Sequence, residues 1–265
     1  MALASPQLDT PYVLRTDSGG VTTLTLNRGE RFNPLSEEMM SALQVEIDAI
    51  AVDASVRVLV LAANGKAFCA GHDLKQMRAS PSAEYYKKLF AQCSKLMLSI
   101  QQMPQPVIAR VQGIATAAGC QLVAMCDLAV ATSDARFAVS GVNYGLFCST
   151  PSVGLARNVP RKQAMEMLLT GEFIDAQTAL ERGLVNRVVV QEALDAEVAK
   201  FTASILAKPA VAIAMGKQMF YRQLEMGIGA AYQLAGETMA CNMMDEAALE
   251  GVQAFIEKRR PAWQS

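Results

Sequence analysis

The first half of the chain alternates between short apolar runs and longer amphipathic stretches. Residues 56–62 form an apolar run without polar alternation, which indicates a strand covered on both faces. Apolar residues recur at helical spacing after Ser36, whose hydroxyl can cap a helix. The repeated order of strand and helix predicts a layered α/β domain with right-handed crossovers. Strands are expected at residues 12–16, 21–27, 56–62, 107–111, 127–131 and 136–139, a helix at 83–101, and a turn followed by a helix at 113–125.

Helical patterns dominate after about Pro151, and only residues 185–190 still indicate a strand. The expected boundary lies near Ala207-Lys208-Pro209, which divides the chain into a core domain at 1–207 and a helical region at 208–265. That region is rich in Ala, Met and Gly and buries little surface by itself. We expect it to pack against neighbouring subunits, with packing on its own core as the alternative. The expected helices span residues 161–169, 175–182, 192–206, 209–225, 229–241 and 245–259.

Composition narrows the class of protein. Hydrophobic residues make up 52% of the chain and charged residues 18%, enough for a large core. A net charge of -1 provides no general attraction for nucleic acid or an anionic membrane, and no apolar run approaches the ~20 residues that span a bilayer. The first residues do not resemble a targeting signal. The six cysteines are scattered, so we expect reduced thiols, no metal site and a cytoplasmic location.

Two short turns of small residues are candidates for chemistry. Ala70-Gly71-His72-Asp73 and Ala117-Ala118-Gly119 each follow an expected buried strand and lead toward a helix start. Such turns expose backbone N–H groups, and the helix terminus adds positive potential. Two N–H groups that converge on one oxygen would stabilise an enolate formed from a thioester. Taken singly, either turn is better interpreted as a tight structural loop.

Four motifs occur in order along the chain, and they carry a resemblance to a known family. Residues 12–263 resemble the crotonase (enoyl-CoA hydratase/isomerase) superfamily, and are most similar to its enoyl-CoA hydratase domain-containing branch. The resemblance implies a crotonase-like spiral of ββα units with a C-terminal helical trimerisation region. It also implies a homotrimer or a hexamer made of two trimers. The ligand would be a coenzyme A thioester of fatty acid metabolism, with no prosthetic group. The motifs are residues 27–35, 68–74 (Phe-Cys-Ala-Gly-His-Asp-Leu), 113–127 (with Ala-Ala-Gly-Cys-Gln-Leu) and 250–263.

The same resemblance assigns roles to individual positions. The backbone N–H groups of His72 and Ala118 would form the oxyanion hole. Glu30 stands where relatives often have a lysine near CoA, so Arg28 or Arg31 is expected to supply the positive charge for the phosphates instead. The implied CoA contacts are Arg31, Phe32, Pro34, Ala70 and Leu74, together with Phe255 and Lys258, which would reach the CoA of a neighbouring subunit.

The sequence departs from the family pattern at both catalytic acids. Gln121 matches the first glutamate of the hydratases and Gly141 matches the second. An amide cannot accept a proton near pH 7, and each positioned acid or base contributes roughly 10²–10⁴-fold to rate. His72, the only histidine, is expected to act through its backbone N–H, with a side-chain role as the alternative. Cys148 is either a buried inert thiol or a nucleophile.

The expected function is binding of an acyl-CoA or enoyl-CoA with polarisation of its thioester carbonyl. The family implies a lyase or isomerase, with enoyl-CoA hydration as the reaction, although the two replaced glutamates argue against ordinary hydratase activity. One alternative is a catalytically silent acyl-CoA-binding protein. Another is a different acyl-CoA reaction, such as thioester hydrolysis or decarboxylation.

Overall fold

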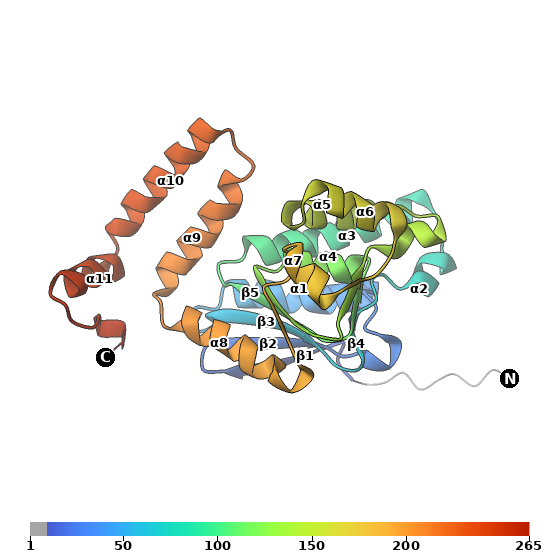
Figure 1. Ribbon diagram of the computed structural model, residues 1–265, viewed down its shortest axis with the longest axis horizontal. Coiled ribbons are helices and arrows are strands. Elements are labelled where there is room, and N and C mark those ends of the chain that lie inside the picture. Colours follow the sequence, from blue (N-terminus) through green and yellow to red (C-terminus); the bar gives the residue numbers. More distant parts are fainter. Residues whose placement is uncertain (1–9, 265) are drawn as a thin grey trace.

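The computed structural model describes residues 10–264 (Figure 1), and a six-stranded sheet runs through the core. Its order is β1-β2-β3-β5-β7-β10, with β1 antiparallel to β2 and every later pair parallel. The strands at residues 12–16, 21–27, 56–62, 107–111 and 127–131 were therefore predicted correctly apart from their ends. The strands are β1 (Val13–Ser18), β2 (Val21–Leu26), β3 (Val58–Ala63), β5 (Val107–Val111), β7 (Leu128–Thr132) and β10 (Arg187–Val189).

A second sheet of four short strands lies beside the first, in the order β4-β6-β8-β9. After β3, β5 and β7 in turn, the chain crosses within a few residues into β4, β6 and β8, and then continues toward helices. Each passage is one ββα unit, and the repetition confirms the predicted crotonase-like spiral. The strands are β4 (Ala67–Cys69), β6 (Ile114–Thr116), β8 (Arg136–Ala138) and β9 (Ile174–Asp175).

Helices cover both faces of the large sheet, as the unbroken apolar run of β3 predicts. Leu59 and Leu61 face the main core, whereas Val58 and Val60 pack with Leu194 on the other side. Ser36 accepts a hydrogen bond from the Met39 backbone at 3.2 Å, which confirms the predicted cap. The main core lies under α1 (Glu37–Ala51), α3 (Ala83–Gln102) and α4 (Ala118–Met125), and the other face is covered by α8 (Leu194–Leu206).

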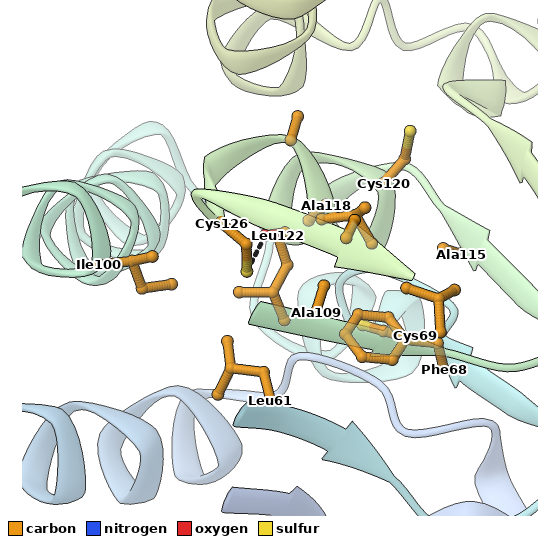
Figure 2. Close-up of a cluster of buried hydrophobic side chains, with 14 of the residues drawn as sticks. Leu61, Phe68, Cys69, Ile100, Ala109, Ala115, Ala118, Cys120, Leu122 and Cys126 are labelled. Carbon is orange, nitrogen blue, oxygen red and sulfur yellow. Dashed lines mark hydrogen bonds between the residues drawn. The ribbon is translucent and has the colours of Figure 1, made fainter. Parts of the chain in front are cut away.

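The core beneath α4 is drawn in Figure 2. Phe68 and Cys69 of β4 and Ala115 of β6 are fully buried there with Leu122 of α4. The Cys126 thiol donates a hydrogen bond to the Leu122 carbonyl at 3.2 Å, at the end of the same helix. This packing fixes α4 against the short strands, so the position of its first residue is set by the core.

Three helices extend away from this core at the C-terminal end of the chain (Figure 1): α9 (Ala210–Gln223), α10 (Ile228–Met243) and α11 (Glu246–Ile256). Many of their apolar side chains are exposed, among them Ile228, Tyr232, Met239, Met244 and Phe255. The division of the chain at residue 207 stays a prediction. In the described range no single helix has the length and apolarity to cross a membrane; only the pair Gln191–Leu206 and Ala210–Gln223, bent by 103°, passes by length and composition.

The pattern analysis was wrong where elements are short. Residues 113–125 were expected to hold a turn and a helix, but the segment begins with strand β6. Strand β4 and strand β9 were not predicted either, because two or three residues are too few to show a period. One helix was missed, α5 (Ser149–Asn158), whereas α6 (Arg161–Thr170), α7 (Ala176–Glu181) and a helix start after residue 73, now seen as α2 (Leu74–Ala79), were expected.

Candidate functional site

A cavity of about 330 Å³ lies where the ends of β4, β6 and β8 meet. Five of the predicted site residues line it together: Ala70, His72, Leu74, Ala118 and Gly141. The remaining wall is largely apolar, from Met77, Phe90, Ala117, Tyr144, Leu146, Phe147 and Pro151, with polar atoms from Thr116, Ser140, Cys148, Ser149 and Thr150.

The first turn of the candidate site is held by a neighbouring loop. The Leu35 N–H donates to the Gly71 carbonyl at 2.8 Å, and the Ala70 N–H donates to the Phe32 carbonyl at 3.0 Å. Gly71 has a φ of 86°, which favours glycine. The turn leads directly into α2, where Asp73 accepts hydrogen bonds from the first-turn N–H groups of Lys75 and Gln76. Asp73 is therefore a helix cap.

Asn33 fixes that neighbouring loop, and the sequence analysis did not single it out. It is fully buried, with a φ of 50°. Its side-chain oxygen accepts from the Arg28 N–H at 2.8 Å, and its amide donates to the Asn64 and Ala67 carbonyls at 2.8 and 2.9 Å. An Asn-Pro pair indicates a turn, but the sequence does not reveal that this turn supports residues 70 and 71.

The second turn places the start of α4 at the cavity. Ala117 has φ 51° and ψ -120°, a strained conformation for a residue with a side chain. Its own N–H donates to the Ala138 carbonyl at 2.9 Å, so its position is held by β8. Ala118 follows as the first helical residue. In the described part of the chain, no backbone carbonyl accepts a hydrogen bond from the N–H of Ala118 or of His72.

The two turns touch each other through glycines. A Cβ on Gly71 would lie 3.1 Å from the Ala118 backbone nitrogen and 3.0 Å from the Ala117 Cβ. A Cβ on Gly119 would overlap the Cys69 carbonyl oxygen. The backbones therefore approach as closely as glycine allows. His72 and Ala118 consequently belong to neighbouring parts of the cavity wall.

The His72 ring points into the protein rather than to a charged partner. Its Nδ1 lies 3.2 Å from the Leu35 carbonyl, which can only accept, so Nδ1 carries the proton in that hydrogen bond. Nε2 is buried without a hydrogen-bond partner, and the ring packs edge-on to Phe90 at 5.7 Å. Burial lowers the pKa of His72, with the Leu35 hydrogen bond opposing, so the ring is neutral near pH 7.

Neither position of the missing glutamates offers an acid. Gln121 is buried and is not among the residues that line the cavity, and its Oε1 has no hydrogen-bond partner. Gly141 does line the cavity, but a Cβ there would overlap the Leu146 carbonyl oxygen and lie 2.7 Å from the Cys148 sulfur. The Gly141 N–H donates to that sulfur at 3.2 Å. The space beside residue 141 is therefore already filled.

No residue with a carboxylate, ammonium or guanidinium group is among those that line this cavity. Its titratable groups are His72, Tyr144 and Cys148, and burial raises the pKa of the Cys148 thiol. A raised pKa disfavours the thiolate, so the inert-thiol interpretation of Cys148 is the better supported. The cavity is uncharged at neutral pH.

A smaller polar pocket of about 260 Å³ adjoins the first turn and contains Arg31, Pro34 and Lys75. Arg31 is half exposed and donates to Asp73 at 2.9 Å, which leaves further N–H groups free for a ligand. Arg28 also lines this pocket, but it is buried, donates to the carbonyls of Thr10 and Pro11, and lies 3.8 Å from the Tyr12 ring. Of the two arginines proposed from the sequence, Arg31 is therefore the more accessible to a ligand.

The other predicted CoA contacts lie apart from the cavity. Phe32 supports the first turn through its backbone, and its half-exposed side chain does not line the cavity. Phe255 and Lys258 lie at the end of α11, far from α2 and α4 in Figure 1. Within one chain, these two residues do not reach the site.

A family model, protein sequences and solved structures all relate this chain to the same family. A family model described as enoyl-CoA hydratase/isomerase matches residues 16–265. The chain is 45% identical to the mitochondrial enoyl-CoA hydratase domain-containing protein 3 of Xenopus laevis over 254 residues, which is 96% of this chain and 86% of that protein. The crystal structure of an enoyl-CoA hydratase from Mycobacterium smegmatis is 65% identical with a TM-score of 0.95, covering 97% of this chain and all of that one.

The crystal structure of human enoyl-CoA hydratase domain-containing protein 3 is 42% identical, with a TM-score of 0.92, and covers 95% of this chain and all of that one. The agreement extends over nearly the whole chain, through both sheets and the C-terminal helices. The chain therefore belongs to the enoyl-CoA hydratase/isomerase family, within the crotonase superfamily and its enoyl-CoA hydratase domain-containing branch.

Proposed function

We propose that this protein binds an acyl-CoA or enoyl-CoA and polarises its thioester carbonyl with the N–H groups of His72 and Ala118. The observation that supports the proposal is the close contact between the two turns at Gly71 and Gly119, since His72 and Ala118 line the same mostly apolar cavity. Removing one comparable hydrogen-bond donor typically lowers the reaction rate by ~10²–10³-fold. A site with two such donors would therefore stabilise the transition state strongly.

The polar pocket provides a place for the CoA phosphates. Arg31 and Lys75 supply positive charge there, next to the carboxylates of Glu38 and Asp73, and Pro34 lines the same pocket. The Arg31–Asp73 ion pair lies at the start of α2, one residue from His72. A thioester that extends from this pocket into the apolar cavity would pass the first turn, with Ala70 and Leu74 at the cavity wall.

Ordinary two-carboxylate hydration is poorly matched to this cavity. Gln121 and Gly141 supply no acid, and no other carboxylate lines the wall. Each lost acid or base removes roughly 10²–10⁴-fold in rate. The same observation favours the second candidate, an acyl-CoA-binding protein without turnover. Hydrolysis and decarboxylation depend more on the oxyanion hole than on paired carboxylates, and they remain alternatives for the reaction.

Two measurements test the proposal separately. Calorimetric titration with butyryl-CoA, which has no double bond to hydrate, measures binding alone. Infrared spectroscopy with a ¹³C-labelled thioester carbonyl then tests the hole: two hydrogen bonds should lower the carbonyl stretching frequency on binding. Binding without any frequency change would contradict the oxyanion hole, and absence of binding would contradict the whole proposal.

Turnover of crotonyl-CoA, followed by loss of the enoyl-thioester absorbance, separates an enzyme from a silent binder. We expect hydration slower than in a two-glutamate relative by 10²-fold or more. Neither Gln121→Glu nor Gly141→Glu is a simple gain-of-function variant, because residue 121 does not line the cavity and a side chain at residue 141 would collide with Leu146 and Cys148. Normal hydratase rates in the unmodified protein would show that another group carries the proton.

We also propose that the helical region mediates self-association as a trimer or a dimer of trimers. The support is the exposed apolar surface of α10 and α11, including Phe255 and Ile256. Assembly would also decide whether Phe255 and Lys258 reach the CoA of a neighbour. Light scattering coupled to size-exclusion chromatography tests this directly, and a monomer at micromolar concentration would contradict it. A cytoplasmic location stays a prediction, and several relatives are named mitochondrial.

A further inference from the structure

We propose that Thr116 and Ser140 form a specificity-determining hydroxyl pair that binds a neutral oxygen atom on the acyl chain near the thioester carbonyl. Their hydroxyl oxygens lie 3.0 Å apart, and both residues line the cavity. The inference rests on the proposed function, because an acyl chain enters the cavity only if the protein binds a CoA thioester. The inference adds which feature of the acyl chain the cavity selects, namely a neutral oxygen atom near the thioester carbonyl.

The backbone places Thr116 and Ser140 between the proposed oxyanion-hole turns and Gly141. Thr116 is the last residue of β6, two residues before Ala118, and its carbonyl oxygen would lie 3.0 Å from a Cβ on Gly71. Ser140 follows β8, which pairs with β6, and it precedes Gly141. The pair thus lies beside the proposed oxyanion-hole turns and beside Gly141, where the family's second acid is missing. An oxygen on the carbons next to the thioester carbonyl would face this wall.

The two hydroxyls together have spare hydrogen-bonding capacity. When one donates to the other, the pair keeps one O–H donor and several lone pairs. In the described chain, the Thr116 and Ser140 side chains have no other hydrogen bonds. Ser140 is only 9% exposed, so bulk water competes little for its hydroxyl. A hydroxyl or ketone oxygen on the ligand can use these sites, whereas a saturated chain leaves them unused.

The charge of the surrounding wall decides between a neutral and an ionised oxygen. The cavity contains no lysine or arginine, and its histidine and cysteine are neutral near pH 7. A carboxylate on the acyl chain would lose its hydration without gaining a cation, which is costly in a buried site. The pair therefore favours acyl groups with a hydroxyl or ketone over dicarboxylic acyl groups.

Calorimetric titrations of the full-length protein at pH 7 with three CoA thioesters test this inference. We expect 3-hydroxybutyryl-CoA to bind about 10-fold tighter than butyryl-CoA, as one to two added hydrogen bonds allow, and succinyl-CoA to bind at least 10-fold more weakly than butyryl-CoA. Ser140→Ala and Thr116→Val should each reduce the preference for 3-hydroxybutyryl-CoA over butyryl-CoA to threefold or less. Ser152→Ala is the matched control, because Ser152 does not line the cavity and its hydroxyl bonds to the Ser149 carbonyl. The preference for 3-hydroxybutyryl-CoA should persist in this variant.

The outcomes are distinguishable. Equal affinity for butyryl-CoA and 3-hydroxybutyryl-CoA would overturn the inference while leaving the proposed function intact, as would a preference that survives both variants. Succinyl-CoA binding as tightly as butyryl-CoA would overturn the selection against charge. If none of the three thioesters binds, the proposed function fails and this inference fails with it. Circular dichroism spectra that match the unmodified protein verify that each variant is folded.

Discussion

Gly119 lies against Cys69 so closely that a Cβ atom on the glycine would overlap the carbonyl oxygen of the cysteine. The contact joins the first turn of α4 to the end of β4, which are about fifty residues apart in the chain. A second close approach, between Gly71 and the Ala118 nitrogen, lies beside it. The geometry of the proposed oxyanion hole therefore depends on two residues that have no side chain.

The Gly119→Ala variant should be strongly destabilised, by about 3 kcal/mol in the free energy of unfolding, because the obstructing atom is backbone and cannot rotate away. Butyryl-CoA binding should weaken in whatever folded protein remains. Gly216→Ala is the matched control: nothing lies within 4 Å of its added Cβ in the interior of α9. That variant should be stabilised by about 0.5–1 kcal/mol. Urea unfolding measures the free energy of unfolding of both variants. Equal changes in Gly119→Ala and Gly216→Ala would contradict the close contact at Gly119.

The Ala117→Gly variant should be more stable than the unmodified protein. Ala117 holds φ 51° and ψ -120°, which glycine adopts without the strain that a Cβ brings. The relieved strain should exceed the added entropy of glycine in the unfolded chain, for a net gain of about 1 kcal/mol. Thermal unfolding measures the gain as a rise of a few degrees in Tm. A loss of stability would show that the Ala117 side chain contributes more by packing than its backbone costs.

The sequence indicated most of the large sheet and most of the helices because these elements are long enough to show a period. Residues 107–111 were predicted with the exact bounds of β5, and the cap at Ser36 followed from residue chemistry. In the second sheet, only β8 was predicted, at residues 136–139, whereas β4, β6 and β9, with two or three residues each, were not. Their strand conformation is imposed by pairing across the sheet, which no local pattern encodes.

The candidate site was predictable to the level of its motifs but not its side-chain geometry. The turns at residues 70–73 and 117–119 were identified, and Ala70, His72, Leu74, Ala118 and Gly141 share one cavity. Two features depend on packing between distant segments. Gln121 is buried outside the cavity lining, and Arg28 donates hydrogen bonds to backbone carbonyls. The roles of Asn33 and of the Thr116–Ser140 pair also arise only when separate segments meet.

Lys217 should be important for holding α9 to the core. Its ammonium group donates to the carbonyls of Ile100 and Gln105 at 2.9 Å and to Asp127 at 2.6 Å, and it is 9% exposed. Lys217→Met would leave the Asp127 carboxylate without its cation, and we expect a loss of about 3–5 kcal/mol in the free energy of unfolding.

Two comparisons show whether this loss comes from the unpaired charge. Lys217→Met combined with Asp127→Asn should be less destabilised than Lys217→Met alone, since the lone carboxylate is gone. Lys200→Met removes an exposed lysine paired with Glu197 and should change stability by less than about 1 kcal/mol. Urea unfolding of the variants gives each value. Similar losses of stability in Lys217→Met and Lys200→Met would contradict the prediction that the buried ammonium of Lys217 holds α9 to the core.

The stability of the protein should depend on the protonation of His72 in mildly acidic solution. Burial lowers the pKa of this ring in the folded state, with the hydrogen bond to Leu35 opposing, whereas the unfolded chain keeps a value near 6.5. Between the folded and unfolded pKa values, the unfolded chain binds a proton that the folded protein does not. The free energy of unfolding should therefore fall as pH falls below about 6.5, by up to ~1.4 kcal/mol per pH unit, and be independent of His72 above that pH.

Because His72 is the only histidine, its titration can be followed without ambiguity by proton NMR of the ring, alongside urea unfolding from pH 5 to 8. The His72→Asn variant keeps a donor for the Leu35 carbonyl but does not titrate, so its stability should vary less over this range than that of the unmodified protein. The difference between the two proteins isolates the ring from the carboxylates, which titrate at lower pH. A folded-state pKa at or above 6.5 would mean that the ring reaches water or an anion. In that case the His72 side chain would become a candidate for proton transfer at the thioester rather than a neutral part of the wall.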